Sequence, residues 1–488
     1  GGLPDRPAQG VIAGERMSKV SDFAVALLAG LGLLTLAGCA HYQPQPLVPE
    51  TTAADFEARS LADPGLKQFV EANVHRELPG WPLAAWDFEA LALTAFYFHP
   101  DLDVARARWD VAQAGQVTAG ERPNPTASFQ PGRRAGVGPP WLLGLTFNIP
   151  IETAGKRGYR LAQARQLTDA ARLNLATAAW LVRSRVRRSL LDLQAAREME
   201  RTLAQQQTIQ TSLVKVLEDQ LAAGGASQLE VSRARVAVET TRLAMVDAQQ
   251  QAAEARAQLA VALGVPARAL DGVNLVTDTA APPPLSAPEV RRQAVLNRAD
   301  ILGALADYAA AQSALQLEIA RQYPDLQLGP GYQLDQNISQ WRLGFTAALP
   351  VFHQNQGAIA QATARRAEAA TRFTALQARV VGEIDRALAS YQVVQAKTGA
   401  ADALLARLRQ QEELTKAMIA AGEAAKPALL TVQLEYLTAH LARLDAQVRG
   451  RLALAALEDA VQGPLIDTFQ TSPRPAAAPE AVTPLAAP

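Results

Sequence analysis

Side chains that could do chemistry are sparse in this chain. The whole sequence holds one cysteine, five histidines and four methionines. It shows no glycine-rich phosphate loop, no nucleophile elbow, no His-Glu-x-x-His pair and no cluster of paired acids. His353 has no second ligand near it in the sequence, so we expect a histidine at a junction between two elements rather than a metal site. We therefore expect no catalytic residue, no cofactor and no metal, and we do not expect an enzyme.

The lone cysteine, Cys39, follows a nearly continuous apolar stretch that begins at Phe23 and ends Leu36-Ala37-Gly38. An apolar run closed by small residues is typical of a secretory signal, and Leu-Ala-Gly-Cys resembles the bacterial lipoprotein signal. We expect acylation of the Cys39 thiol and removal of residues 1–38. Ala40 stands where retention in the inner membrane would usually require aspartate, which favours the outer membrane. The alternative is a retained N-terminal membrane helix, although the stretch is short for the ~20 residues of a span.

The elements that follow occur twice. Trp141-Leu142-Leu143-Gly144-Leu145-Thr146-Phe147-Asn148-Ile149-Pro150 is echoed by Trp341-Arg342-Leu343-Gly344-Phe345-Thr346-Ala347-Ala348-Leu349-Pro350. Matches continue on both sides at nearly the same offset, from Asp101 with Asp300 to Gly224 with Gly422. An ordered series of this kind indicates an internal repeat.

We divide the chain accordingly. Residues 39–85 are an extended tether, 86–275 are repeat one, 276–288 are a linker, 289–465 are repeat two, and 466–488 are a Pro/Ala-rich disordered tail.

Each copy of the duplicated segment alternates like a strand of a membrane barrel. Large apolar residues share one face, while small or polar residues share the other. We expect strands at 126–131, 141–149, 326–334 and 340–349. Arg342 would lie on the lumen side. The residues expected to face lipid are Trp141, Leu143, Leu145, Phe147, Trp341, Leu343 and Phe345. The alternative is a pair of ordinary amphipathic hairpins on a soluble core.

Long helices surround these strands. No Gly or Pro interrupts the chain between Gly158 and Gly224 or across 227–263, and a helix over the first interval would be about 100 Å long. Arginines at 183, 185, 187 and 188 exclude a membrane span there. The second repeat has comparable long helical stretches at about 358–421 and 428–457, interrupted by Gly382 and Gly399. Equal numbers of basic and acidic residues, 47 each, offer no case for nucleic acid. We expect a mainly α chain with long antiparallel coiled-coil hairpins.

Four strands cannot close a barrel, and an open edge in lipid leaves backbone groups unpaired. Closed barrels begin at about 8 strands, which are largely filled by side chains. Three chains would supply about 12 strands and leave a lumen. We therefore expect a homotrimer.

Together these features resemble the TolC-type outer-membrane efflux proteins, and most of all their lipoprotein members that serve multidrug or heavy-metal pumps. The resemblance covers about 85–465. It rests on His99-Pro100-Asp101-Leu102, Pro123-Asn124-Pro125, the segment from Ile149 to Arg157, and the tips at 223–227 and 421–423. It implies a 12-stranded barrel in the outer membrane, a periplasmic α-barrel, and a passive conduit fed by an inner-membrane pump and a periplasmic adaptor.

The resemblance also suggests functional residues. The tips would contact the adaptor through Gly224, Gly225, Ser227, Gly422 and Glu423. Some relatives close the tube with acidic residues just after the second tip, but Ala428 and Thr431 occupy those positions here. In repeat one, Glu230 and Arg233 stand at the equivalent offsets. They are either a gate or a solvated helix face.

Two other functions remain open. An outlet for a type I protein secretion system would use the same tube. A periplasmic coiled-coil adaptor lipoprotein would carry one hairpin with Gly-rich β domains, whereas this sequence has two equivalent hairpins.

Overall fold

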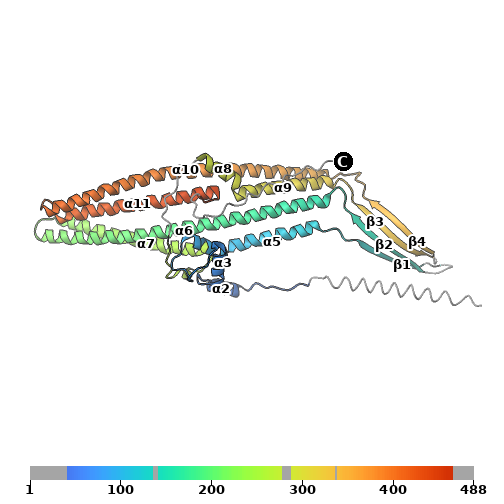
Figure 1. Cartoon of the computed structure of the whole chain (residues 1–488), viewed down its shortest axis with the longest axis horizontal. Helices are drawn as coiled ribbons and strands as arrows, with labels where there is room; N and C mark the ends of the chain where they lie inside the picture. The colour runs from blue at the N-terminus through green and yellow to red at the C-terminus, as the bar shows by residue number, and fades with distance from the viewer. Residues whose placement is uncertain (1–40, 134, 136–140, 277–286, 336–337, 465–488) are drawn as a thin grey trace, which may run out of the picture. The chain divides into compact units, whose positions relative to one another are not determined.

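The computed structural model describes residues 41–133, 135, 141–276, 287–335 and 338–464. The chain divides into two compact units, residues 1–58 and residues 59–488. Within the described part of the first unit, helix α2 (Pro49–Ala58) has no buried residue. The second unit contains the four strands and the long helices (Figure 1).

The region expected to be an extended tether is folded from Arg59 onward. Helix α3 (Pro64–Val74) begins where the Asp63 side chain accepts a hydrogen bond from the Leu66 backbone N–H at 2.9 Å, which satisfies one of the free donors of its first turn. Leu66 and Val70 are buried in a core that also contains Trp86. The expectation of an extended chain was therefore wrong for residues 59–85, because most large apolar side chains of this polar-looking segment pack in one cluster.

Each repeat contains a short helix, a longer helix, a strand pair and two very long helices. Repeat one has α4 (Phe88–Phe98), α5 (Pro100–Gly120), β1 (Thr126–Arg133), β2 (Trp141–Ile151), α6 (Lys156–Ala222) and α7 (Gln228–Leu263). A 3-10 turn, η1 (Ala267–Leu270), follows. Repeat two has α8 (Ala287–Asn297), α9 (Ala299–Ala320), β3 (Leu326–Asp335), β4 (Ile338–Ala347), α10 (Gln356–Ala420) and α11 (Lys426–Val461).

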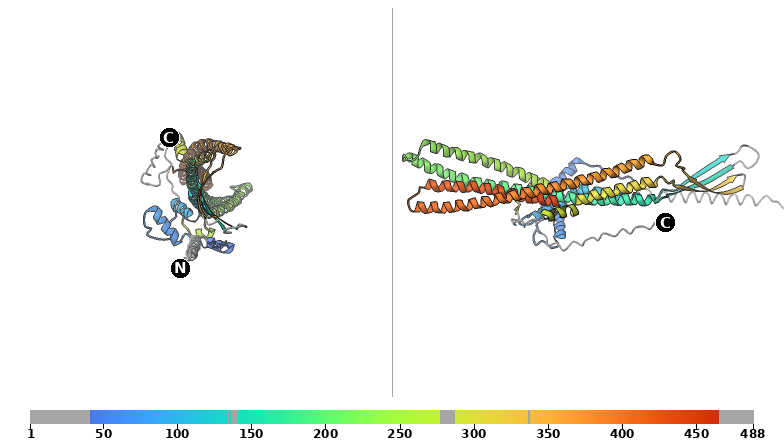
Figure 2. Two further views of the ribbon diagram at one scale, coloured as in Figure 1. Left: turned by 90° about the vertical axis from the view of Figure 1, so that its right-hand side faces the viewer. Right: turned by 90° about the horizontal axis from the view of Figure 1, so that it is seen from above.

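The long helices lie side by side in antiparallel pairs, α6 with α7 and α10 with α11 (Figure 1). Helix α6 has 67 residues and α10 has 65, so each is about 100 Å long. The predicted long hairpins are confirmed. Seen from one end, the helices form a curved layer (Figure 2). Among the described residues, no helix combines the length and apolarity that crossing a membrane would take.

One face of this helical layer is covered by the shorter helices. In α6, Val182, Val186 and Leu190 are buried in the core shared with α3 and α4. Their counterparts in α10, Val380, Ile384 and Leu388, are buried in a second cluster with residues of α8. The two stripes recur at the same steps of about one helical turn, so the duplicated sequence buries the same face of both long helices.

The four strands form one antiparallel sheet in the order β1-β2-β3-β4. The register pairs Leu145 of β2 with Phe129 of β1 and with Tyr332 of β3. Tyr332 in turn pairs with Trp341 of β4, and their rings are 5.0 Å apart. Successive residues of a strand point to opposite faces, so this register determines which side chains share a surface.

Candidate functional site

One face of the sheet is apolar across all four strands. The register places Leu145, Phe129, Tyr332 and Trp341 on it, and the alternation carries this face along each strand. Its other large apolar members are Trp141, Leu143, Phe147, Ile149, Leu326, Leu328, Leu334, Leu343 and Phe345. Trp341 is 83% exposed and Phe345 is 73% exposed. An exposed apolar surface of this extent needs a cover, either another protein surface or lipid.

The opposite face of the sheet is mostly small and polar, with Leu142 and Ile338 as its large apolar members. It carries glycines and amide or hydroxyl side chains, such as Thr146, Asn148, Gln327 and Gly344. Asn148 donates a hydrogen bond to the Gln327 side chain at 3.0 Å. Arg342 is on this face as well and donates to the Gln340 side-chain oxygen at 3.0 Å. The sheet is therefore amphipathic as a whole.

The sheet has two open edges. Within the described residues, β1 pairs only with β2, and β4 pairs only with β3. Their outer backbone groups would pair in a closed ring of strands, as a membrane environment requires.

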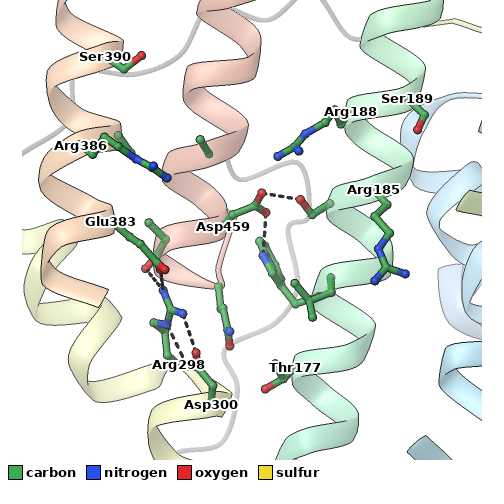
Figure 3. Close-up of a pocket in the computed structure, with 17 residues that line it drawn as sticks. Thr177, Arg185, Arg188, Ser189, Arg298, Asp300, Glu383, Arg386, Ser390 and Asp459 are labelled. Carbon is green, nitrogen blue, oxygen red and sulfur yellow. Dashed lines mark hydrogen bonds and ion pairs between the residues drawn. The ribbon is translucent and has the colours of Figure 1, made fainter. Parts of the chain in front are cut away.

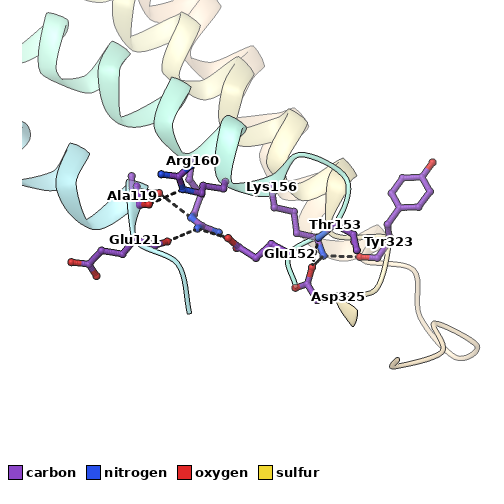
Figure 4. A network of polar contacts seen from close by, with 10 residues as sticks. Ala119, Glu121, Glu152, Thr153, Lys156, Arg160, Tyr323 and Asp325 are labelled. Atoms are coloured by element: carbon purple, nitrogen blue, oxygen red, sulfur yellow. Dashed lines mark hydrogen bonds and ion pairs between the residues drawn. The ribbon is translucent and has the colours of Figure 1, made fainter. Parts of the chain in front are cut away.

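A polar network fixes the sheet to the helices (Figure 4). The Lys156 ammonium, at the start of α6, donates to the Tyr323 carbonyl at 2.7 Å and pairs with Asp325 at 2.6 Å. Asp325 also accepts from the Thr153 backbone N–H at 3.0 Å. Burial alone would raise the pKa of Asp325, but the hydrogen bonds from Lys156 and Thr153 lower it below its ordinary value. This side chain is thus an anion that ties the end of β2 to the start of β3.

A second part of that network ties α5 to the same corner. The Arg157 guanidinium donates to the Gly120 carbonyl at 2.7 Å. Arg160 pairs with Glu152 and also donates to the Glu121 carbonyl at 3.2 Å. The segment from Ile149 to Arg157, which carried part of the resemblance, therefore acts as a rigid junction between sheet and helices.

The two hairpin tips have the same backbone geometry. At the first tip, Gly225 N–H bonds to the Gln220 carbonyl at 2.7 Å and Gly224 N–H to the Leu221 carbonyl at 3.0 Å. At the second, Glu423 N–H bonds to Met418 and Gly422 N–H to Ile419 at 2.8 and 3.0 Å. These are the two bonds of a Schellman motif, with a left-handed residue that favours glycine. Gly224 has φ +77° and Gly422 has φ +78°.

The start of α7 gives Glu230 a local role. Ser227 is the N-cap, and its backbone N–H and hydroxyl donate to the Glu230 carboxylate at 2.7 and 2.8 Å. The Glu230 backbone N–H donates back to the Ser227 hydroxyl, which completes a capping box. Arg233 is exposed one turn further on, and its charge contributes to lowering the pKa of Glu230, but no ion pair within 4.0 Å joins the two side chains. A gate formed by these two residues stays a prediction, and the capping role of Glu230 is independent of it.

The helix starts at the two hairpin tips should differ in how much stability they lose at acidic pH. Hydrogen bonds from the Ser227 backbone and hydroxyl lower the pKa of Glu230 below its ordinary value of 4.5. Because the folded-state pKa is the lower one, the stabilisation is complete above pH 4.5 and is lost as pH falls through the folded-state value. We expect hydrogen-exchange protection of the first turn of α7 to fall on acidification. Helix α11 is the internal control, because its N-cap Ala425 makes no side-chain bond. Equal loss at both tips, or loss that persists in Glu230→Gln, would contradict this assignment.

The remaining predicted residues do not gather into a chemical site. Cys39 lies outside the described residues, as do the predicted tail, 466–488, and residues 277–286 of the linker. His353 is exposed just after β4. Across the part of the chain that is described, no group of three or more His, Cys, Asp or Glu side chains could hold a metal ion.

A set of polar contacts between the two repeats has no counterpart in the sequence-based expectations. Trp180 and Ser184 of α6 donate to the two carboxylate oxygens of Asp459 in α11, at 3.0 and 2.5 Å. The neighbouring Glu458 is 1% exposed and pairs with Arg183 and Arg187 of α6. The partners are more than 270 residues apart in sequence, so periodicity within either helix could not have paired them.

Comparison with known proteins agrees with this architecture. Residues 98–265 match the family model described as outer membrane efflux protein. The cobalt-zinc-cadmium resistance protein CzcC of Cupriavidus metallidurans is 27% identical over 212 residues, which are 43% of this chain and 50% of that protein. The pyoverdine export outer membrane protein OpmQ of Pseudomonas aeruginosa is 27% identical over 220 residues, 44% of this chain and 46% of that protein. The chain thus spans about half the length of the curated relatives it matches.

Solved structures extend the likeness to the whole fold. The outer membrane protein VceC of Vibrio cholerae superposes with a TM-score of 0.65 at 21% identity, covering 78% of this chain and 97% of VceC. Identity at this level supports the fold alone. Residues 98–265 thus resemble the outer membrane efflux proteins, and the described fold is similar to that of the outer membrane protein VceC.

Proposed function

We propose that the chain is the outer-membrane channel of a tripartite efflux system, a passive trimeric conduit that carries small molecules such as drugs or metal ions from the periplasm to the exterior. The observation that carries this proposal is the amphipathic sheet. Its apolar face matches the lipid-facing band of a membrane barrel, and its small, polar face matches the lining of a lumen.

The trimer follows from the open edges. Pairing β4 of one copy with β1 of the next satisfies both edges, and three copies give a ring of about 12 strands with a central channel. The polar junction at Lys156 and Asp325 would then continue this channel from the sheet into the helical layer.

The long helices would account for the extension of the tube into the periplasm. A length of about 100 Å in α6 and α10 suits a tube that extends through the periplasm. The tips at Gly224, Gly225, Ser227, Gly422 and Glu423 lie at the far end of the hairpins from the sheet (Figure 1). We propose that they contact a periplasmic adaptor, which in turn joins an inner-membrane pump.

Localisation and anchoring belong to the same proposal. The chain would reside in the outer membrane of a Gram-negative bacterium, with acylated Cys39 as a second attachment. One acyl chain alone binds a membrane only marginally, whereas several chains, or one chain together with another membrane attachment, anchor stably. The sheet would therefore hold the trimer, and the lipid would assist sorting and insertion.

A pair of neighbouring substitutions tests the membrane strand. Leu145→Arg puts a guanidinium on the apolar face, where burial in lipid costs about 2–4 kcal/mol at mid-depth. Thr146→Arg puts the same group on the polar face. We expect Leu145→Arg to lose trimer from outer-membrane fractions, while Thr146→Arg inserts and changes ion selectivity in planar bilayers. Equal insertion of both variants, or a wild-type protein that forms no pores, would refute the membrane assignment.

An outlet for secreted proteins would use the same tube, and no contact in the structure favours it. A periplasmic adaptor is less consistent with the molecule, because a four-stranded sheet with one largely apolar, exposed face has no role in a spacer. Small-molecule efflux is therefore the function that we propose.

A further inference from the structure

A cavity of about 720 Å³ lies between α6, α10, α11 and the α8–α9 junction (Figure 3). Its volume is within the usual range for small-molecule sites, roughly 300–1,000 Å³. Its lining mixes an apolar part, Trp180 and Leu181, with hydroxyls and charged groups. The basic residues that line it are Arg185, Arg188, Arg298 and Arg386, and the acidic ones are Asp300, Glu383 and Asp459.

The acidic groups of this cavity are already engaged. Asp459 accepts from Trp180 and Ser184, as described above. Arg298 forms a two-pronged pair with Asp300, at 2.9 and 2.6 Å, and reaches Glu383 at 3.4 Å. Arg185 pairs with Asp101, which lies outside the lining, at 2.7 Å. These pairs leave no carboxylate in the lining without a partner.

Two arginines of the cavity lining take part in none of these pairs. Arg188 and Arg386 donate no hydrogen bond and form no ion pair to any residue of the described ranges. Arg188 does have a longer-range electrostatic interaction with Asp192, one helical turn away. Their side chains point toward one another across the cavity (Figure 3). Their separation in sequence is that of Gly224 and Gly422, so they are counterparts in the two repeats. Duplication has therefore placed two free guanidiniums face to face.

Both arginines are on the uncovered face of the helical layer. Residues two positions apart on a helix point about 200° apart. Arg188 stands two positions from the buried Val186 and Leu190, and Arg386 stands two positions from the buried Ile384 and Leu388. The arginines consequently point away from the face that α3, α4 and α8 cover. The proposed ring would place this uncovered face toward the conduit.

We propose that Arg188 and Arg386 form a binding site for the oxyanion group, a carboxylate or a phosphate, of a small solute that passes through the conduit. A guanidinium presents a planar fork that matches such groups, and the cavity offers one fork on each side. Trp180 and Leu181 would contact the less polar part of the solute. The placement in a conduit rests on the proposed function, whereas the binding chemistry depends only on the cavity.

Calorimetry on the detergent-solubilised full chain tests the site by measuring its affinity for inorganic pyrophosphate. The ionic strength is held constant, because salt screens the interaction between exposed charges. We expect saturable binding and at least a tenfold loss of affinity in the double variant Arg188→Gln, Arg386→Gln. The double variant with lysine at both positions keeps the charge but loses the fork, and its affinity should lie between the two. Wild-type affinity in the glutamine variant, or no pyrophosphate binding by the wild type, would overturn the inference.

A matched control removes the same charge elsewhere. Arg172→Gln with Arg379→Gln takes one arginine from each of the same two helices outside the cavity lining. We expect it to bind pyrophosphate like the wild type, and an equal loss of affinity would show a diffuse charge effect and overturn the site. Planar-bilayer recordings separate the two proposals. A conducting trimer that binds no pyrophosphate refutes only the site, and a binding protein that never conducts refutes only the conduit.

Discussion

Substituting Gly264 with alanine should lower the free energy of unfolding by about 2–5 kcal/mol. Gly264 ends α7 with φ +74°, a conformation that costs a residue with a side chain about 1–2 kcal/mol. A Cβ there would lie 2.7 Å from the Phe98 carbonyl oxygen and 2.9 Å from the His99 Cα. Both are backbone atoms that cannot rotate away, so overpacking adds roughly 1–3 kcal/mol.

The close approach at Gly264 is structural, because it docks the end of α7 on the α4–α5 corner. Arg59 bridges the same two segments by donating to the Phe98 carbonyl at 2.7 Å and the Gly264 carbonyl at 2.8 Å. Thermal unfolding followed by circular dichroism measures the effect. Gly272→Ala is the matched control, since φ is +72° there and nothing lies within 4 Å of an added Cβ. Equal destabilisation by both variants would show that backbone conformation, and not the approach to Phe98, decides the cost.

Removing the Glu458 carboxylate should destabilise the contact between the repeats by about 3–5 kcal/mol, because Glu458→Ala removes a buried carboxylate that pairs with two partly buried arginines. Glu458 is 1% exposed and pairs with Arg187 and, at 3.8 Å, with Arg183. The Arg183 guanidinium is stacked 4.8 Å from the Phe88 ring centre and 4.7 Å from that of Trp180. Burial lowers the pKa of Arg183, although the charges of Asp459 and Glu89 oppose that shift.

Two comparisons make the Glu458 prediction specific. Replacing all three charges by apolar residues, with Arg183→Met, Arg187→Met and Glu458→Leu, should recover most of the loss, because no uncompensated charge remains buried. Glu239→Ala breaks an ion pair with Arg242 in which both side chains are 69% exposed, and it should change stability by less than about 0.5 kcal/mol. Chemical denaturation of the full chain measures all three. A loss for Glu458→Ala no greater than that for Glu239→Ala would contradict the buried role.

The sequence by itself determined the elements and their duplication. Strand alternation around Trp141 and Trp341, and long intervals without Gly or Pro, predicted strands and helices that the structure places within a few residues of the expected positions. These patterns succeed because side-chain periodicity is a local property, two residues in a strand and 3.6 in a helix. The positions of the tip glycines were equally predictable from the sequence, since a chain that reverses its direction after a helix needs a residue in the left-handed conformation.

Only the tertiary structure determined which side chains contact one another. The register between strands made one face of the sheet apolar from Phe129 to Phe345, a result that no single strand contains. Packing folded residues 59–85 onto a core and gave Glu230 a bond within its own turn. Side-chain contacts between repeats joined Glu458 to α6 and left Arg188 facing Arg386. Such pairings are set by free energies summed over residues hundreds of positions apart, and periodicity along one element carries no record of them.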